Sequence, residues 1–322
     1  MTEGYPRLLG DIGGTNARWA WQESAGMPVQ DISVVPCEAS PSLYDSAAAY
    51  LASRGGARPK YAGIGIATTV DGDEVSMTNH SWSFSIAKLK QALGLERCLV
   101  INDFTALAIS LPTLGPRDLS AIGGGKAVSG APVALLGPGT GLGVSGLLPG
   151  PGAHWSALSG EGGHVTLAPA DDMEAALLAF LRAHLGHVSA ESVLSGPGLV
   201  NLYRAVCALD RTAPRDLDPS GVTNAAIAGT DPLCVQTVEF FACFLGNVAG
   251  NLALTLGARG GLYIGGGIVP RLGSAFDASV FRKRFEEKGR FAEYLRAIPT
   301  WVITAAAPAL VGVSLALDDL PA

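Results

Sequence analysis

Residues 7–21 read RLLGDIGGTNARWAW: an apolar run, a turn rich in glycine, and a second apolar run. The residues after Gly14 alternate in the manner of a β-strand and lack the 3.6-residue period of a helix. The stretch therefore predicts a strand, a glycine turn and a second strand.

A second copy of this pattern lies about 125 residues further along the chain. Residues 132–136 are an apolar run, residues 137–143 read GPGTGLG, and residues 144–148 are apolar again. Both turns contain a threonine among their glycines. A repeated pattern indicates a repeated structural unit, so we expect two related half-domains that face each other.

The rest of the chain alternates between predicted strands and predicted helices. Further strands are predicted at residues 61–68, 96–101, 262–264 and 301–304. Helices are predicted at residues 85–93, 104–111, 172–185, 197–209, 232–256 and 280–295, with a last helix from about residue 308. Such alternation is typical of an α/β protein.

The composition excludes several classes of protein. Of the 322 residues, 48% are apolar and only 16% are charged, which excludes a disordered chain. The formal net charge of −6 leaves no basic surplus to neutralise a nucleic-acid backbone. The 42 glycines are clustered, so we interpret them as functional turns.

Three further observations bear on the compartment. The five cysteines include no CxxC pair, which argues against a disulfide framework or a zinc site and favours a reducing cytoplasm. Residues 1–7 are polar, so no signal peptide is predicted. The stretch between Arg296 and Asp318 has no charge and is long enough to span a membrane, but Pro299 and Pro308 divide it into a short strand and a helix. We expect a soluble protein.

The glycine turns suit phosphate. A glycine turn between strands directs several backbone N–H groups toward one point, and glycine lets a ligand approach the backbone. Two common motifs do not fit, because Gly125-Lys126 is followed by Ala127 and because both glycine turns lead into strands rather than helices. Each turn alone also fits a plain β-hairpin. The duplication favours a nucleotide held between two hairpins.

Acidic residues stand where two predicted strands end. Asp11 begins the first turn, where a carboxylate can hold Mg²⁺ directly or through water, or can bond its own following backbone. Asn102-Asp103 ends another apolar strand, a position where α/β proteins bind ligands. The alternative role of Asp103 is to cap the helix that begins at Phe104.

Residues 160–164, GEGGH, are the polar cluster that most clearly indicates a binding site. Glu161 and His164 among glycines can exchange hydrogen bonds with vicinal hydroxyls. Metal ligation is the competing interpretation, but the other four histidines show no zinc spacing. Glu191 fits either a site residue or an acid on a helix surface.

Taken together and in order, these residues closely resemble the bacterial glucokinase family of ATP-dependent sugar kinases, over essentially the whole chain. Residues 10–18 and 137–143 resemble its two phosphate hairpins, and residues 101–106, INDFTA, its catalytic-base segment. Segments similar to its sugar side and adenosine side are residues 77–82, 160–164, 189–203 and 262–271. Two departures are Thr68-Thr69-Val70, where proline is common, and Ala309, which replaces a usual glycine before the last helix.

The resemblance implies an α/β fold of two lobes, the actin/hexokinase-like (ribonuclease H-like) fold, with duplicated phosphate-binding hairpins and a central cleft. It implies a small domain of residues 1–112 plus 304–322 and a large domain of residues 113–303. It also implies glucose and ATP as substrates, Mg²⁺ as cofactor, lobe closure on sugar binding, a homodimer, and a cytoplasmic enzyme of glycolysis that produces glucose 6-phosphate.

The resemblance also assigns roles to residues. Asp103 is expected to accept the proton of the attacking sugar hydroxyl as general base, and Asp11 to orient Mg²⁺ through water. The expected sugar ligands are Asn102, Asp103, Glu161, His164, Glu191 and Asn79. The expected nucleotide-binding residues are Gly10, Asp11, Ile12, Gly13, Gly14, Thr15, Gly139, Thr140, Gly141, Gly265, Gly266 and Gly267.

Two alternatives remain at this point. A sugar-sensing transcriptional regulator on a related fold would carry an N-terminal DNA-binding module and zinc cysteines, whereas here the first hairpin motif starts at residue 10 and those cysteines are missing. A kinase for another hexose or with another phosphoryl donor is the second alternative.

Overall fold

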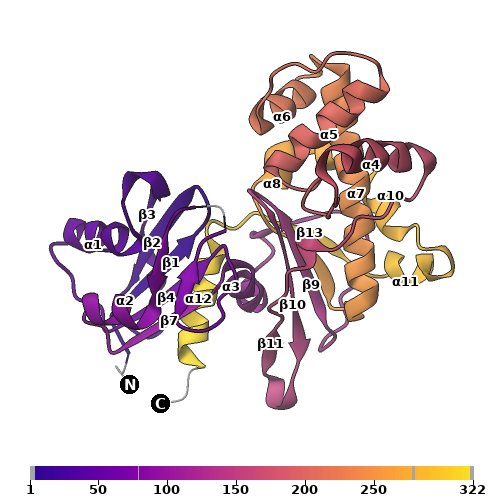
Figure 1. The fold of residues 1–322 in the computed structure, drawn as a ribbon. Helices are drawn as coiled ribbons and strands as arrows, with labels where there is room; N and C mark the ends of the chain where they lie inside the picture. Colours follow the sequence, from indigo (N-terminus) through magenta and orange to yellow (C-terminus); the bar gives the residue numbers. More distant parts are fainter. Residues whose placement is uncertain (1–3, 79, 278–279, 320–322) are drawn as a thin grey trace. The chain divides into compact units, whose positions relative to one another are not determined.

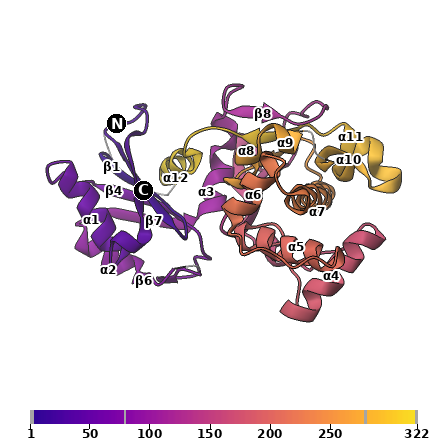
Figure 2. The same cartoon turned by 90° about the horizontal axis from the view of Figure 1, so that it is seen from above.

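The computed structural model describes residues 4–78, 80–277 and 280–319. The chain folds as two compact units. Unit 1 comprises residues 1–114, 157–159 and 305–322, and unit 2 comprises residues 115–156 and 160–304. Both are α/β units (Figures 1 and 2).

Unit 1 is built on a five-stranded sheet of order β3-β2-β1-β4-β7. Strands β1, β4 and β7 are parallel, and β2 is antiparallel to both of its neighbours. Helices α1 and α2 lie on one side of this sheet and α3 and α12 on the other (Figures 1 and 2). Its elements are β1 Arg7–Ile12, β2 Asn16–Gln22, β3 Gln30–Pro36, α1 Leu43–Ser53, β4 Tyr61–Ile66, β5 Glu74–Ser76, β6 Ser83–Ser85, α2 Ile86–Ala92, β7 Arg97–Asn102, α3 Asp103–Ser110 and α12 Pro308–Asp318.

Unit 2 is built on a six-stranded sheet of order β11-β10-β9-β12-β13-β8. Strands β9, β12 and β13 are parallel, and β10 is antiparallel to β9. Its elements are β8 Leu119–Ala121, β9 Val133–Pro138, β10 Leu142–Pro149, β11 Trp155–Ala157, α4 Asp172–Leu185, α5 Gly196–Leu209, α6 Pro219–Ile227, α7 Pro232–Leu256, β12 Gly261–Ile264, α8 Ile268–Leu272, α9 Ser274–Asp277, α10 Phe281–Glu286, α11 Ala292–Arg296 and β13 Thr300–Ile303.

The two sheets repeat one topology. In each, a hairpin (β1–β2 or β9–β10) is followed in space by two strands parallel to its first strand. Each sheet has its own apolar core, around Trp19 and Ile64 in unit 1 and around Phe241 and Phe244 in unit 2. The predicted duplication is therefore present in the fold.

One helix of the described residues, α7, is long and apolar enough to cross a membrane by length and composition. Of its most apolar window, 67% is buried inside the protein. The helix contributes Phe241, Ala242 and Phe244 to the core of unit 2, as a core helix of a globular unit does. Residues 296–318, the other apolar stretch, form strand β13 and helix α12, as the prolines predict.

Three predictions about elements need comment. Helices α4 and α7 have the predicted bounds, and Asp171 rather than Asp172 caps α4. The helix predicted at residues 280–295 is wrong: it is divided into α10, a short 3-10 turn and α11, and Gly289 in the break has φ +55°. Ala309 lies inside α12 rather than before it.

Candidate functional site

The first hairpin joins β1 to β2 through a short turn. Ile12 pairs with Ala17 at its end, and the Gly13 N–H donates to the Asn16 carbonyl oxygen at 2.9 Å. Gly10 has a packing role, because a Cβ there would lie 2.8 Å from the ring of buried Trp19. The predicted nucleotide residues 10–15 therefore include at least one glycine that the sheet itself requires.

Asp11 is buried at the base of this hairpin. It lies opposite Arg18 in the register of β1 and β2, and Arg18 Nη1 donates to Asp11 Oδ2 at 3.0 Å. Burial raises the pKa of the Asp11 carboxyl, and the charge and hydrogen bond of Arg18 offset part of this shift. The sequence predicted no role for Arg18; its position opposite Asp11 across a hairpin is the signal that could have found the pair.

Strand β7 brings Asn102 and Asp103 to the same edge of the unit 1 sheet. Ile12, Ile66 and Asn102 are the last residues of the parallel strands β1, β4 and β7, and Ile66 pairs in register with the other two. Carboxyl ends of parallel strands are where α/β sheets bind ligands.

The local structure distinguishes the two residues. Asn102, not Asp103, caps α3: its Oδ1 accepts from the N–H groups of Phe104 and Thr105 at 2.9 and 3.1 Å, and its Nδ2 donates to the Thr68 carbonyl at 3.3 Å. Asp103 is the first helical residue, and its Oδ1 accepts from Phe104 N–H at 2.9 Å. The capping alternative for Asp103 is therefore wrong.

Glycines allow α3 to approach the sheet. An ideal Cβ on Gly65 would lie 3.5 Å from Asp103 Cα and 3.3 Å from Ala106 Cβ, and Gly65 pairs with Asp11 across β1 and β4. On the same face of the sheet, α12 packs beside α3, and a Cβ on its Gly312 would overlap the Ala106 carbonyl. Asp103 is thus held beside Gly65 of β4, which pairs with Asp11 of the neighbouring strand β1.

The second hairpin joins β9 to β10. Leu142 pairs with Pro138, and the Gly139 N–H donates to the Gly141 carbonyl at 2.8 Å, so the turn is residues 139–141. Two other segments support it. The Gly196 N–H donates to the Gly139 carbonyl at 2.8 Å, and a Cβ on Gly266 would overlap the Pro138 carbonyl.

The Gly265–Gly267 turn follows β12 directly. The Gly265 N–H donates to the Leu136 carbonyl at 2.8 Å, and Gly266 has φ +77°, which favours glycine. The structure therefore places this predicted adenosine-side turn against the second hairpin.

The loop of Glu161 and His164 packs on β10. Gly160 forms a bridge with Val144, and a Cβ on Gly163 would overlap the Leu142 carbonyl. His164 Nε2 lies 3.9 Å from Glu161 Oε2, and both side chains are about half exposed. The glycines therefore hold the loop against the strand and leave the Glu161 and His164 side chains accessible.

Glu191 links this loop to the second hairpin. Its backbone N–H donates to the Gly163 carbonyl at 2.8 Å, and its Oε2 accepts from the Leu142 N–H at 2.8 Å. A Cβ on Gly141 would overlap the same carboxylate. Glu191 is therefore not a simple surface acid, and the sequence offered no signal for its contact with Leu142, which lies 49 residues away.

The predicted site residues thus form two groups. Unit 1 holds the first hairpin with Asn102 and Asp103, and unit 2 holds the second hairpin with Glu161, His164, Glu191 and the turn after β12. Asn79 lies outside the described residues. Among those residues, no group of three or more His, Cys, Asp or Glu side chains could hold a metal ion.

One further contact was not predicted from the sequence. Thr105 of α3 and Ser159 share a hydrogen bond of 3.2 Å between their hydroxyls, both in unit 1, and the chain enters unit 2 at the next residue, Gly160. Hydroxyl pairs this far apart in sequence leave no pattern in the sequence.

Comparisons with known proteins agree with this description. The glucokinase family profile matches residues 8–320. The glucokinase of Chromobacterium violaceum is 51% identical over 99% of this chain and 91% of its own length, and that of Aromatoleum aromaticum is 53% identical over 98% and 95%. The crystal structure of a glucokinase from an Antarctic psychrotroph has a TM-score of 0.86 at 36% identity and covers 98% of this chain and 99% of that one.

The repeated sheets and glycine hairpins define a sugar kinase with the two-lobed actin/hexokinase-like fold. A transcriptional regulator shares the fold (TM-score 0.68), but at 18% identity this likeness shows the fold alone. This chain belongs to the glucokinase family, whose enzymes phosphorylate glucose with ATP. The enzymatic interpretation is confirmed over the regulatory one.

Proposed function

We propose that this chain phosphorylates glucose with ATP and that Asp103 is its general base. One observation supports the assignment of Asp103 as general base. At the end of β7, Asn102 caps α3, so the Asp103 side chain next to it is not needed as a cap, and it lies at the sheet edge that also carries Asp11. A carboxylate held there at the first turn of a helix is rigidly placed.

This placement supports the following reaction. The oxygen of a glucose hydroxyl attacks the γ-phosphorus of ATP, its proton passes to the Asp103 carboxylate, and the bond from the γ-phosphorus to the β–γ bridging oxygen breaks to release ADP. Phosphoryl transfer depends mainly on positioning and on stabilising charge. Asp103 contributes the proton acceptor and, through the rigid start of α3, the orientation.

The sugar would be held by polar side chains. Glu161 and His164 are accessible on a loop that glycines fasten to β10, and Glu191 lies against the same loop. Asn102 and Asn79 complete the proposed set. Carboxylate and imidazole groups form charge-assisted hydrogen bonds with sugar hydroxyls, and such bonds are the stronger ones.

The nucleotide would be bound by the two hairpins and by residues 265–267. Around Gly139 and Gly267 an added Cβ would meet nothing within 4 Å, so these positions leave the backbone open to a ligand. A ROK family glucokinase of Streptomyces griseus, similar in fold at 20% identity, has been solved with glucose and AMPPNP.

The chemistry of Asp11 fits a magnesium ion. Mg²⁺ prefers oxygen ligands and is commonly held by one or two carboxylates, with water and substrate phosphates as its other ligands. Arg18 contacts Oδ2 of Asp11, and a nearby cation would also favour the ionised form that burial disfavours. Asp11 would hold the ion, which when bound neutralises charge on the phosphate oxygens.

We also propose that the enzyme is a cytoplasmic homodimer that supplies glucose 6-phosphate to glycolysis. All five cysteines are free thiols, which fits a reducing compartment. Sedimentation of the purified protein at micromolar concentration tests the dimer, and a monomer across that range would contradict it.

The test of the general base is Asp103→Asn. Loss of a positioned base lowers kcat by about 10²–10⁴-fold, and glucose binding measured by calorimetry should be retained. Asp216→Asn is the matched control, because Asp216 is exposed and distant in sequence from both hairpins. Near-normal kcat in the Asp103 variant would remove this residue from the mechanism.

A further inference from the structure

A cavity of about 670 Å³ lies at the other edge of the unit 2 sheet from the second hairpin. Its walls come from the segment before β9, from Arg259 before β12, and from Tyr294 and the segment before β13. Because β9, β12 and β13 are parallel, these segments share the amino edge of the sheet, whereas residues 139–141 and 265–267 lie at the carboxyl edge. Strands of four to six residues separate the two edges by roughly 13–20 Å.

The cavity has one wall built by a glycine. Gly125 has φ +103°, and a Cβ there would lie 2.7 Å from the Ala297 carbonyl oxygen. The Lys126 N–H donates to that same oxygen at 3.1 Å, and the Val128 N–H donates to the Arg259 carbonyl at 2.9 Å. The residues GGK, which do not make a P-loop, instead fasten this segment across the ends of β12 and β13.

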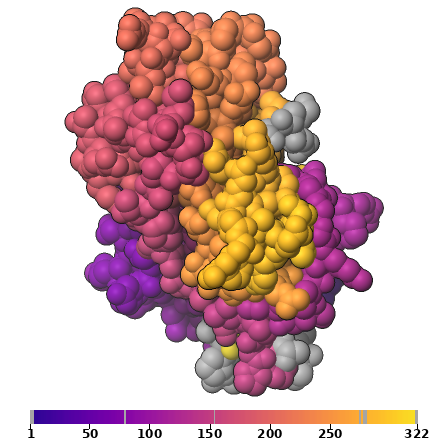
Figure 3. Space-filling view, turned by 90° about the vertical axis from the view of Figure 1, so that its right-hand side faces the viewer, coloured from indigo at the N-terminus to yellow at the C-terminus, as the bar shows by residue number. Residues whose placement is uncertain are grey.

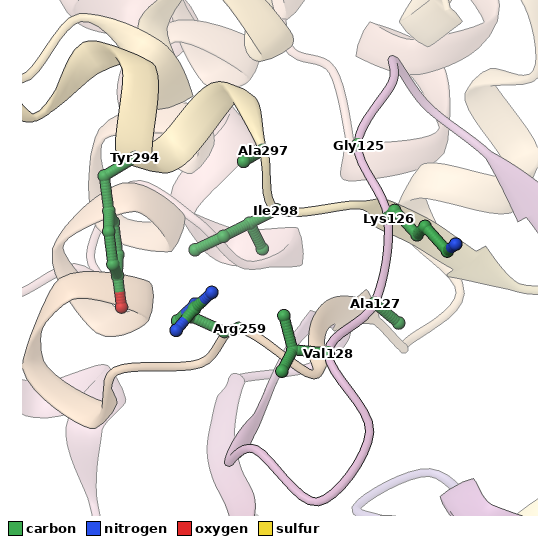
Figure 4. A pocket seen from close by; sticks show the side chains of 8 residues that line it. All are labelled: Gly125, Lys126, Ala127, Val128, Arg259, Tyr294, Ala297 and Ile298. Carbon is green, nitrogen blue, oxygen red and sulfur yellow. The ribbon is translucent and has the colours of Figure 1, made fainter.

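Two polar groups border apolar side chains in this open cavity: the guanidinium of Arg259, which is exposed, and the hydroxyl of the partly buried Tyr294. Figure 4 shows Arg259 between Tyr294 and Val128, with Ile298 above it, whereas the Lys126 ammonium points away. Among the described residues, no side-chain hydrogen bond or ion pair joins either the Arg259 guanidinium or the Tyr294 hydroxyl. Figure 3 shows the face of unit 2 on which the neighbouring helices α10 and α11 are exposed, in yellow.

We propose that this cavity binds a small organic anion, a carboxylate or phosphate monoester with an apolar or planar body. The Arg259 guanidinium presents a planar fork that matches carboxylate and phosphate oxygens, and the Tyr294 hydroxyl adds one donor. Val128, Ile298 and the Tyr294 ring supply the apolar surface. The volume falls within the range of about 300–1,000 Å³ typical of small-molecule sites. This site lies at the opposite edge of the sheet from the nucleotide turns of the proposed function, so the anion is distinct from the proposed substrates.

Calorimetry of the full-length protein tests the site with three probes: phenyl phosphate, benzoate and inorganic phosphate. Saturating glucose and a non-hydrolysable ATP analogue keep the substrate sites occupied. We expect at least one of the two organic probes to bind, and the probe that binds more tightly identifies the anion class. Arg259→Gln should weaken it at least about 10-fold and Tyr294→Phe less, because Arg259 contributes a positive charge and a two-pronged contact, whereas Tyr294 contributes one neutral donor. Arg204→Gln, an exposed arginine on α5, should bind as the wild type does.

Three results would overturn the proposal. Neither organic probe binds at about 10 mM; the Arg259 variant binds as tightly as the wild type; or inorganic phosphate binds as tightly as phenyl phosphate, which would leave the apolar wall without a role. Unchanged melting temperatures of the unliganded variants establish that they are folded. Loss of turnover in Asp103→Asn does not affect these results, so the two proposals fail separately.

Discussion

The two hairpins have the same topology and different chemistry. In the first, the strand carries its own carboxylate, Asp11, which is buried and paired with Arg18. In the second, the register places Gly137 where the first has Asp11, and the carboxylate is supplied by Glu191, from a different segment. The two hairpins thus share a backbone topology but differ in the source of their carboxylate. In the first hairpin the carboxylate belongs to a strand of the hairpin itself, and in the second it belongs to a residue outside the hairpin.

The two hairpins also differ in the space around their glycines. Gly10 in the first hairpin is required by packing against Trp19, whereas Gly139 in the second borders open space. A glycine with open space around it has no structural reason to lack a side chain. Gly13, in the first turn, has a single contact with the Asn16 carbonyl oxygen at 3.4 Å, so both turns leave the backbone open, whereas the strand position Gly10 does not.

Gly139→Val is expected to have the largest effect on this comparison. The valine meets no protein atom near its Cβ, so the melting temperature should stay unchanged, but it blocks approach to the turn. Keeping the phosphate away from backbone donors that would stabilise its developing charge should lower kcat/KM for ATP by about 10²-fold. Gly124→Val, at an equally open glycine, is the control, and equal kinetics of the two variants would show that residues 139–141 bind no phosphate.

Glu191→Gln tests whether the Glu191 carboxylate affects the use of both glucose and ATP. Gln retains an acceptor for the Leu142 N–H but loses the charge, so kcat/KM should fall about 10-fold for glucose and for ATP alike. The exposed Glu239 on α7, changed to Gln, should leave both values unchanged. A loss confined to glucose would mean that the contact with the hairpin has no catalytic consequence.

Asp11→Asn separates stability from activity. Since burial raises the pKa of Asp11 in the folded state, the folded protein binds more protons than the unfolded one between the unfolded pKa of about 3.9 and the raised value, and stability falls as pH rises through that window. The variant should therefore melt above the wild type at pH 7, with a difference that shrinks as pH falls toward 4. Its kcat/KM should fall by about 10-fold when magnesium is limiting. A variant that melts below the wild type at pH 7 would contradict the burial argument.

Gly10→Ala should have the smallest catalytic effect. The added methyl meets the Trp19 ring, and overpacking of this kind costs about 1–3 kcal/mol of stability. KM for ATP measured well below the melting temperature should stay near the wild-type value. A selective rise in that KM would make Gly10 a ligand-contacting position like Gly139.

Much of this fold could be predicted because its signals are local. The caps of α4, the prolines at the first positions of α7 and α12, and the glycine turns all act within a few residues. The divided helix after residue 280 was missed because one glycine with positive φ outweighs the apolar spacing around it. Strand β3 and helix α1 were also missed, and β3 is an edge strand with much of its surface exposed, so it carries little apolar pattern.

The candidate site was predictable by residue type and not by contact. Acid and amide residues at strand ends indicate a ligand edge, and Asp103 and Asn102 are there as expected. Asn102 rather than Asp103 caps α3, because its amide oxygen accepts hydrogen bonds from the backbone N–H groups of Phe104 and Thr105. The contacts of Glu191 with Leu142, and of Thr105 with Ser159, join segments about 50 residues apart, which only tertiary structure brings together.

The tie between the first strand and the last helix has a consequence for synthesis on the ribosome. Arg7 of β1 donates to the Ser314 carbonyl at 2.9 Å and pairs with Asp318, and α12 packs closely against α3. Unit 1 therefore needs residues from both ends of the chain, whereas unit 2 is complete once residue 304 has emerged. Translation proceeds at about 5–20 residues per second, and domains generally fold as units. The nascent chain consequently completes unit 2 before unit 1, because helix α12, which packs against the unit 1 sheet, is translated after residue 304.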